Sequence, residues 1–204
     1  MGPLRLHWPL PVKPEERPKI ERDTPDGWYY LRFDGVRNHL VRGCLTCPPG
    51  PATLEMLIRP HETERRQTIM DMWGAAFSLG LDKDGRLSLL REDRERSGVW
   101  LTGKSRLEKD RFHHVAAVFD GTHLKLYLNG GFEGSLPCIG LRSNEKMTLG
   151  VNCGVTKLYT GRKDAWNRAF KGDVAMFRLL ERPFSPDEIR RRAKQSLECM
   201  NRGK

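Results

Sequence analysis

The chain has 204 residues and a formal net charge of +10, because 36 lysines and arginines outnumber 26 aspartates and glutamates. This length fits one large domain, and a hydrophobic share of 38% exceeds what a disordered chain carries. No apolar run approaches the roughly 18 residues that span a bilayer, so we expect no membrane insertion. The basic surface favours RNA or another polyanion, acidic glycans or acidic protein neighbours as partners.

The start of the chain is rich in proline, with six within residues 1–25. Proline excludes a regular helix or a central strand, so residues 1–27 are expected to form an extended arm outside the core. The apolar side chains with which this arm would bind a partner are Leu4, Leu6, Trp8 and Leu10. A secretion signal is not expected, because the segment lacks a continuous apolar stretch. Residues 1–14 carry no acid, which leaves a mitochondrial leader as one option, although the prolines oppose its helix.

From residue 28 onward, short β-branched and aromatic runs alternate with Gly, Asp, Asn and Pro, a pattern typical of antiparallel strands. The expected strands are 28–33, 52–58, 68–72, 75–81, 86–91, 98–102, 113–119, 122–128, 146–151 and 173–180. Three joints, 82–85, 120–121 and 129–130, have the Asp-Gly or Asn-Gly chemistry of tight hairpin turns. The pattern predicts an all-β fold, a two-sheet antiparallel jelly-roll sandwich over residues 28–184.

The last segment, residues 185–204, is predicted to form a helix over 185–199 and a basic tail. Ser185 is the expected N-cap, Pro186 lies in the first turn, and Glu188 completes a capping box. The apolar stripe consists of Ile189, Ala193, Leu197 and Met200. It should pack on the sandwich edge and leave three consecutive arginines facing outward, namely Arg190, Arg191 and Arg192.

Four segments, residues 30–41, 52–60, 111–134 and 170–189, together resemble the laminin G-like jelly-roll domains of the concanavalin A-like lectin and glucanase superfamily. The third is the most specific. It reads as an aromatic residue, His, Val and Ala, a strand, Asp-Gly, a second strand and then Asn-Gly. The resemblance implies the sandwich fold, and a fold of this kind hosts many functions.

Many members of this superfamily bind calcium through one acid shortly after the first Phe-Asp-Gly and another in the final Phe-x-Gly segment. In this sequence Asn38 and Ala175 stand at the corresponding positions, although Asp34 and Asp173 lie close by. Calcium prefers several charged oxygen ligands, so the loss of two carboxylates weakens such a site. We therefore predict no calcium, no other metal and no cofactor.

The chain has five cysteines, at positions 44, 47, 138, 153 and 199. An odd number without a secretion signal favours reduced thiols in an intracellular compartment. A zinc site is the alternative, with Cys44 and Cys47 as one half and Cys138 and Cys153 as the other. The wide spacing of the second pair disfavours it, because a zinc ribbon repeats the close spacing.

Glucanases of the superfamily place two catalytic carboxylates on one strand face, four residues apart. This chain has no such strand, since Glu62, Glu64 and Glu92 lie in arginine-rich stretches that favour solvated loops. His113 and His114 are adjacent on a strand and should point to opposite faces. No hydrolase, zinc-protease or phosphate-loop motif occurs, so we expect no enzymatic activity.

Aromatic and basic residues at strand ends and in the long 152–169 loop are the candidate recognition residues. The aromatic candidates are Trp73, Trp100, Tyr159 and Trp166, and the basic ones are Lys157, Arg162, Lys163 and Arg168. The helix adds its arginine triplet. For each Trp the alternative is packing over the rim of the core, and for the arginines it is a solvated helix face.

These observations lead to two functional hypotheses. The first is a non-catalytic structural or interaction subunit of a large intracellular assembly, organellar or ribonucleoprotein in kind, held through its arm and its basic surface. The second is a carbohydrate-binding, lectin-like module for an acidic glycan. The cellular compartment distinguishes the two hypotheses, because a lectin is expected to be exported and an assembly subunit to remain inside the cell.

Overall fold

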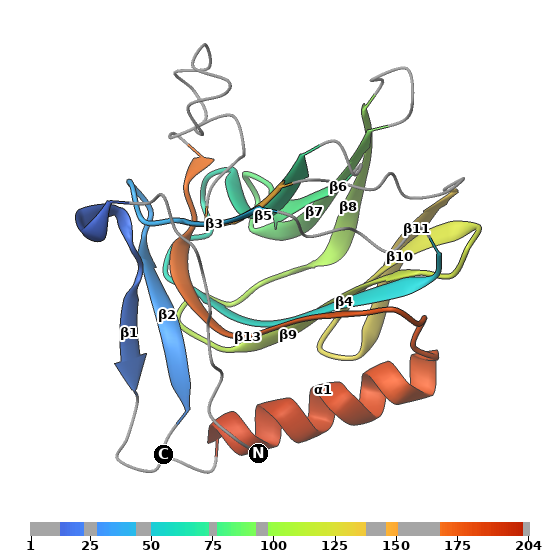
Figure 1. The fold of residues 1–204 in the computed structure, drawn as a ribbon. Helices are drawn as coiled ribbons and strands as arrows, with labels where there is room; N and C mark the ends of the chain where they lie inside the picture. Colours follow the sequence, from blue (N-terminus) through green and yellow to red (C-terminus); the bar gives the residue numbers. More distant parts are fainter. Residues whose placement is uncertain are drawn as a thin grey trace.

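The computed structural model describes residues 13–22, 28–43, 50–73, 77–92, 98–137, 146–150 and 168–201. In these ranges two antiparallel sheets pack face to face, with a single α-helix on the outer side of one of them (Figure 1). The predicted two-sheet sandwich with a C-terminal helix is confirmed. None of the described helices is long and apolar enough to cross a membrane.

The larger sheet has seven described strands in the order β1-β2-β13-β4-β9-β10-β11. They are β1 (Lys19–Arg22), β2 (Tyr29–Asp34), β13 (Lys171–Leu180), β4 (Ala52–Pro60), β9 (His113–Phe119), β10 (His123–Leu128) and β11 (Gly131–Pro137). The smaller sheet has six in the order β3-β12-β5-β6-β7-β8. These are β3 (Leu40–Gly43), β12 (Lys146–Leu149), β5 (Gln67–Trp73), β6 (Phe77–Leu81), β7 (Arg86–Glu92) and β8 (Gly98–Arg106).

All ten predicted strands are found, and three further strands, β1, β3 and β11, were not anticipated. Strand β1 lies within residues 1–27, the segment expected to be an extended arm outside the core. It follows the 3₁₀ turn η1 (Pro14–Glu16) and pairs with β2 at the edge of the larger sheet. The sandwich therefore begins before residue 28. An edge position is where a proline-rich segment can still supply a strand, because one side needs no partner.

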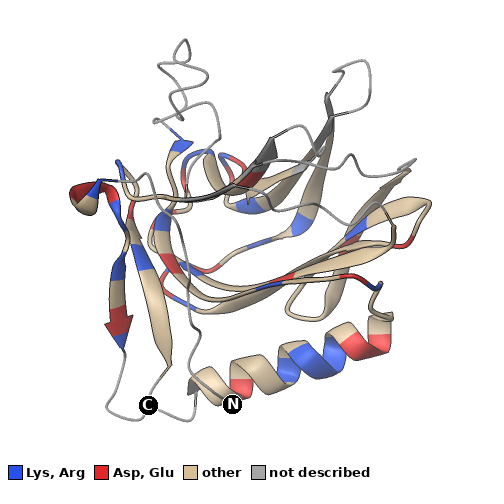
Figure 2. Ribbon diagram, in the orientation of Figure 1, with Lys and Arg blue, Asp and Glu red and all other residues tan. Residues whose placement is uncertain are grey.

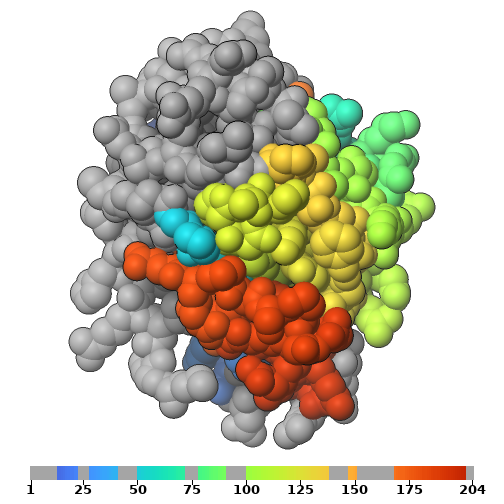
Figure 3. Space-filling model, turned by 90° about the vertical axis from the view of Figure 1, so that its right-hand side faces the viewer, coloured from blue at the N-terminus to red at the C-terminus, as the bar shows by residue number. Residues whose placement is uncertain are grey.

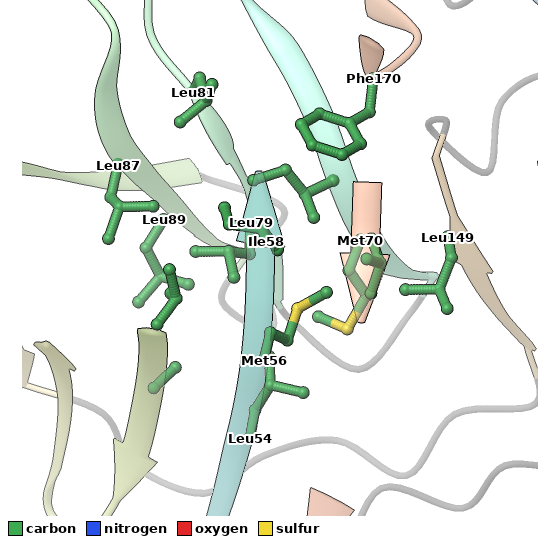
Figure 4. Close-up of a cluster of buried hydrophobic side chains, with 14 of the residues drawn as sticks. Leu54, Met56, Ile58, Met70, Leu79, Leu81, Leu87, Leu89, Leu149 and Phe170 are labelled. Atoms are coloured by element: carbon green, nitrogen blue, oxygen red, sulfur yellow. The ribbon is translucent and has the colours of Figure 1, made fainter. Parts of the chain in front are cut away.

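The core lies between the sheets and follows from the alternation of side chains along each strand. On β4, Leu54, Met56 and Ile58 point inward, and the inward side chains of β5, β6 and β7 meet them (Figure 4). Residues of the opposite parity on β4 face outward. Two of these, Glu55 and Arg59, are charged, and they are central to the ion clusters described below.

The three predicted hairpin turns join the strands on either side of them, β6 to β7, β9 to β10 and β10 to β11. Asn129 and Gly130 both have positive φ, at 50° and 85°, which is the backbone that a primed two-residue turn requires. A side chain at position 130 would also meet the backbone of Arg190 at 3.1 Å. The turn is thus fixed both by its own conformation and by its contact with the helix.

The helix α1 (Pro186–Asn201) lies across the outer face of the larger sheet rather than on its edge (Figure 1). Ser185 Oγ accepts the N–H of Glu188, as predicted for the N-cap. The Glu188 carboxylate does not complete the expected capping box and instead accepts two hydrogen bonds from Arg182. Ile189 packs on β9 and β10, while Leu197 packs near β2 and β13.

Candidate functional site

The outer face of the smaller sheet carries a row of side chains that becomes more exposed toward β8. The strand register aligns Thr148, Asp71, Ser78, Leu90 and Trp100 across five strands. Thr148 is wholly buried and Asp71 is 7% exposed, whereas Trp100 on the edge strand is 51% exposed. The accessible part of this face is therefore its β8 end.

Five side chains line this end, and we call them the β8 rim: Leu90, Trp100, Thr102, Lys104 and Phe132. Trp100, Thr102 and Lys104 alternate along β8 and are all exposed. Trp100 and Thr102 are alternate residues of a regular strand, so they share a face and lie about 6.7 Å apart. Lys104 follows in a register irregularity of β8 between Thr102 and Arg106. The rim thus presents an aromatic ring and a hydroxyl on one face, with an ammonium group beyond them toward β11.

The far end of the rim joins the two sheets. The Lys104 ammonium lies 5.7 Å from the ring centre of Phe132 on β11, and that ring packs edge-on against Tyr127 at 5.6 Å. Glu133, also on β11, reaches back to β8. Its carboxylate accepts the backbone N–H groups of Lys104 and Ser105 at 2.5 and 2.8 Å. This clamp satisfies donors that an edge strand leaves free and fixes the position of Lys104.

Of the recognition residues predicted from the sequence, the structure places Trp100 on this rim. Trp73 ends strand β5, but its side chain is not described. Arg168 is half-buried. The remaining loop candidates, Lys157, Tyr159, Arg162, Lys163 and Trp166, and the arm residues Leu4, Leu6, Trp8 and Leu10, fall outside the described residues, as do Cys44, Cys47, Cys138 and Cys153. Cys199, the fifth cysteine, is a free and exposed thiol.

The sequence did not single out Thr102, Lys104 or Phe132. A signal for the first two existed, since Trp100, Thr102 and Lys104 alternate, but the predicted strand ended at residue 102. Phe132 gave no signal, because it reaches Lys104 only through the meeting of two sheets.

The three arginines of α1 do not act as one outward patch. Arg190 and Arg191 are exposed, and Arg190 pairs with Asp187. Arg192 instead turns under the helix and donates to both carboxylate oxygens of Glu55, at 2.8 and 2.6 Å. The expectation that all three face solvent is wrong for Arg192, because a buried carboxylate on β4 lies within its reach. Figure 2 shows the basic residues in the middle of α1, with acidic residues toward both ends.

Glu55 is the centre of a first ion cluster, which also contains His114, Arg178 and Arg192. The side chains of Glu55 and His114 are completely buried beneath α1, and His114 Nε2 lies 2.9 Å from Glu55 Oε1. Burial alone would raise the pKa of Glu55, but the hydrogen bonds from His114 and Arg192 overcome this and lower its pKa to about 2. The cluster ties α1 to β4, β9 and β13.

Asp173 is the centre of a second cluster on the same sheet face, formed with Arg32, Arg59 and His61. Its buried carboxylate lies 2.7 Å from Arg59, 3.0 Å from Arg32 and 3.0 Å from His61 Nε2. The other ring nitrogen of His61 meets Asp110 at 2.6 Å, and this hydrogen bond lowers the pKa of Asp110. The arginines also stack on Tyr30 and Phe112.

The side chains that could serve as acid–base catalysts are in polar contact with neighbouring groups of the protein. His114 faces Glu55 under the helix, while His113 on the opposite side of β9 lies 2.9 Å from the Glu108 carbonyl. Burial lowers the pKa of His113. Glu62 accepts from Arg65, and Glu64 accepts from Thr63. Each of these groups is thus bound to a neighbour rather than directed at an open cleft.

The two acids nearest the expected calcium positions are also engaged. Asp34 Oδ1 accepts the N–H groups of Val36, Arg37 and Asn38, which closes the turn after β2. Burial raises the pKa of Asp34, but these backbone bonds outweigh it and the net shift is downward. Asp173 is surrounded by cations. Within the described ranges no group of three or more His, Cys, Asp or Glu side chains is arranged to hold a metal.

Comparison with known proteins gives one family and a set of similar folds. The model of the concanavalin A-like lectin/glucanases superfamily matches residues 34–190. Nothing among the curated proteins matches the chain. A heptameric SAP-like pentraxin from Limulus polyphemus superposes with a TM-score of 0.62 at 18% identity, over 80% of this chain and 81% of that one.

Two further structures broaden this picture. Domain 4 of an extracellular arabinanase from Geobacillus stearothermophilus, in complex with arabinotriose, gives a TM-score of 0.64 at 18% identity, over 86% and 81% of the two chains. The binding domain of Paraclostridial Mosquitocidal Protein 1 gives 0.69 at 14% identity, over 92% of this chain and 47% of that one. This chain therefore spans about half the length of that binding domain. Identities this low show the fold alone.

These comparisons contradict the first functional hypothesis, that the chain is a structural subunit of an intracellular assembly, and that prediction is wrong. The similar structures are a pentraxin, the binding domain of a mosquitocidal protein and an arabinanase domain in complex with arabinotriose. Nothing in them supports an RNA partner or a mitochondrial compartment.

Proposed function

Because the chain belongs to the concanavalin A-like lectin/glucanases superfamily, we propose that it is a non-catalytic module that binds an acidic glycan at the β8 rim. The observation that carries this proposal is Trp100, a half-exposed aromatic ring at the accessible end of the outer face of the smaller sheet. An exposed tryptophan has a large rigid apolar surface. Sugar rings have an apolar C–H face that packs against such a surface.

The neighbours of Trp100 supply the polar half of sugar recognition. The Thr102 hydroxyl donates one hydrogen bond and accepts others, which suits the hydroxyl groups of a saccharide. Lys104 adds a positive charge that forms no ion pair with another described residue; Glu133 fixes its backbone and the Phe132 ring lies 5.7 Å from its ammonium group. An unpaired, positioned ammonium favours a carboxylate or sulfate on the ligand over a neutral sugar.

Two wider properties support an acidic ligand and a binding role. The net charge of +10 raises the local concentration of anions at the surface. The wholly buried carboxylates, Glu55 and Asp173, are held by arginines and cannot act as an acid–nucleophile pair on a glycosidic bond. Among similar structures, the arabinanase domain is in complex with arabinotriose.

The test is a binding titration of the purified chain with a polygalacturonate oligosaccharide and with arabinotriose as the neutral probe. Trp100→Ala should weaken binding of the acidic probe about tenfold, since loss of one aromatic stacking contact costs roughly 1–3 kcal/mol. Lys104→Gln should weaken the acidic probe and leave the neutral one unchanged.

The matched control is Trp28→Ala, because Trp28 is also part-exposed, at 39%, but lies directly before β2, away from the β8 rim. It should bind like the wild type. The proposal fails if the wild type binds neither this probe nor any member of a glycan array, or if Trp100→Ala and Trp28→Ala behave alike.

A further inference from the structure

The exposed surface of the β8 rim continues past Lys104 onto the other sheet. Strands β8 and β11 are the last strands of their sheets, and they lie against each other. Phe132 on β11 is 50% exposed, and its ring contacts Tyr127, which belongs to the outer side of the larger sheet beneath α1. The surface that begins at Trp100 on the smaller sheet therefore turns around this edge of the sandwich.

On the larger sheet this surface reaches the first half of α1. The turn between β10 and β11 packs on the helix, since a side chain at Gly130 would meet the backbone of Arg190 at 3.1 Å. Gly130 precedes Phe132 by two residues, so the exposed ring lies close to the helix. Figure 3 shows that β8, β11 and α1 contribute to one face of the molecule.

Arg190 is the cation of α1 that borders this surface. Ile189 and Ala193 are buried against the sheet, and the residue after Ile189 lies about 100° around the helix axis. Arg190 is therefore at the margin between helix and sheet, beside the β10–β11 turn. Its side chain is 61% exposed and pairs with Asp187, which is 87% exposed. An ion pair this exposed contributes little, so an anionic group of a ligand can take the place of Asp187.

Two cations thus lie on either side of an exposed aromatic ring. The Lys104 ammonium lies 5.7 Å from the ring centre of Phe132, and Arg190 lies beyond the turn that precedes Phe132. Lys125, on the same face of the larger sheet, is already paired with Asp120 at 2.6 Å. Two positive charges separated by an apolar ring are complementary to a chain that alternates anionic groups with apolar sugar faces.

We propose that an acidic polysaccharide binds along this whole surface, from Trp100 over Phe132 to Arg190, with one anionic group at Lys104 and another at Arg190. The ligand class is a linear polyanionic glycan, such as a polyuronate, recognised along its chain rather than at a terminal sugar. This inference rests on the proposed function, because it extends the same site. Contacts linked along one chain raise the affinity, since the second forms at a high effective concentration.

The length of the surface distinguishes short ligands from long ones. Trp100 and Lys104 are up to about 14 Å apart along β8, at about 3.4 Å per residue. From Lys104 the path still has to cross Phe132 and the β10–β11 turn. A sugar trimer that lies on Trp100 therefore cannot also reach Arg190, whereas a hexamer can.

Titration calorimetry of the full chain with the trimer and the hexamer of galacturonate tests the inference. The wild type should bind the hexamer at least about tenfold more tightly than the trimer. Arg190→Gln should weaken hexamer binding about fivefold, because one charge contact is lost. It should leave trimer binding unchanged, which also shows that the variant is folded. Arg190→Lys should keep most of the hexamer affinity, because the charge is retained.

Lys19→Gln is the matched control, since it removes one positive charge from the exposed strand β1 on the opposite side of the molecule (Figure 1). It should leave the binding of both oligomers unchanged. The hexamer also gains affinity from its larger number of binding registers, but neither substitution alters that gain. The comparison of Arg190→Gln with Lys19→Gln therefore isolates the contact at the helix.

Two outcomes overturn the inference and leave the proposed function intact. In the first, Arg190→Gln and Lys19→Gln bind the hexamer alike. In the second, the wild type binds trimer and hexamer with the same affinity. In both, trimer binding that is still weakened by Trp100→Ala shows that the β8 rim binds sugar without α1. A chain that binds neither oligomer overturns the inference as well, and the glycan array then decides the proposed function separately.

Discussion

The Glu55 and Asp173 clusters have the same composition but different surroundings. Each places one fully buried carboxylate, on adjacent strands of the same sheet face, among two arginines and one histidine. The Glu55 cluster is covered by α1. The arginines of the two clusters are similarly exposed, with Arg178 and Arg192 at 40% and 24% against Arg32 and Arg59 at 39% and 14%. The Asp173 cluster opens toward solvent at its histidine, because the His61 side chain is 24% exposed whereas that of His114 is wholly buried.

Because their surroundings differ, the two buried carboxylates are expected to contribute differently to the stability of the fold. When a partner is lost under the helix, no water can replace it, so the Glu55 cluster holds the helix in one position on the sheet. At the open cluster His61 reaches solvent and can recover hydration, which His114 beneath the helix cannot. Two ion clusters of the same composition thus differ in the burial of their histidine, and the loss of a partner costs more where that histidine is wholly buried.

The largest expected effect comes from neutralising the covered carboxylate. Glu55→Gln removes the counter-charge of Arg192 and Arg178 and replaces the carboxylate bound to the wholly buried His114 by a neutral amide, and it should lower the free energy of unfolding by about 3–5 kcal/mol. Asp173→Asn should cost less, about 1–3 kcal/mol, because its histidine partner His61 reaches solvent whereas His114 does not. Urea unfolding followed by fluorescence measures both. Glu62→Gln is the control, since its exposed pair with Arg65 should contribute less than about 1 kcal/mol. Equal losses for Glu55→Gln and Asp173→Asn would remove the distinction between the clusters.

Acid should release the covered cluster in a predictable range of pH. The pKa of Glu55 is about 2 in the folded chain, below the 4.5 of a free glutamate. A carboxyl group with a lowered pKa in the folded state stabilises the fold fully above its unfolded pKa, and that stability is lost as the pH falls through the folded pKa. The contribution is on the order of 3 kcal/mol.

Unfolding curves of the wild type and Glu55→Gln, recorded from pH 6 to pH 2, isolate this contribution. The stability gap between them should be constant near pH 6 and should narrow as the pH falls from about 4.5 toward 2. A gap that does not change over this range would mean that Glu55 does not titrate with the fold.

A smaller difference is expected between two neighbouring arginines of α1. Arg192 binds Glu55 and stacks on Phe184 at 4.8 Å, whereas Arg191 is exposed. Arg192→Met should cost about 2 kcal/mol, because His114 and Arg178 still face the carboxylate. Arg191→Met should change stability by no more than about 0.5 kcal/mol. Thermal unfolding of the two variants compares them directly, and similar midpoints would show that Arg192 is not part of the cluster.

The sequence predicted the layers and hairpins well, because these depend on local rules. Alternation on 113–119 and the Asn-Gly at 129–130 act over a few residues, and the structure follows both. The inward turn of Arg192 could not be predicted in this way. A helix spreads three consecutive arginines around its axis, but Glu55, 137 positions away, decides which one turns inward.

The candidate site shows the same limit. Trp100 could be singled out as an aromatic residue in a predicted strand, whereas its rim also needs Phe132 from the other sheet. Strand β1 was missed for a different reason. Four residues with three charges carry no hydrophobic period, and their strand conformation depends on pairing with β2.

The smallest expected effect is no change in the melting temperature when calcium is added, and it concerns the open Asp173 cluster. Many superfamily members use acids near these positions, but here Asp34 closes a turn with three backbone N–H groups and Asp173 faces Arg32, Arg59 and His61. A cation would have to displace those donors and approach the arginines. A calcium site occupied at a hundredfold excess over its dissociation constant would add about 2.7 kcal/mol of stability. We therefore expect the melting temperature to be the same in calcium and in chelator. A calcium-dependent rise of several degrees in the wild type, lost in Asp173→Asn, would show that the open cluster exchanges its arginines for a metal.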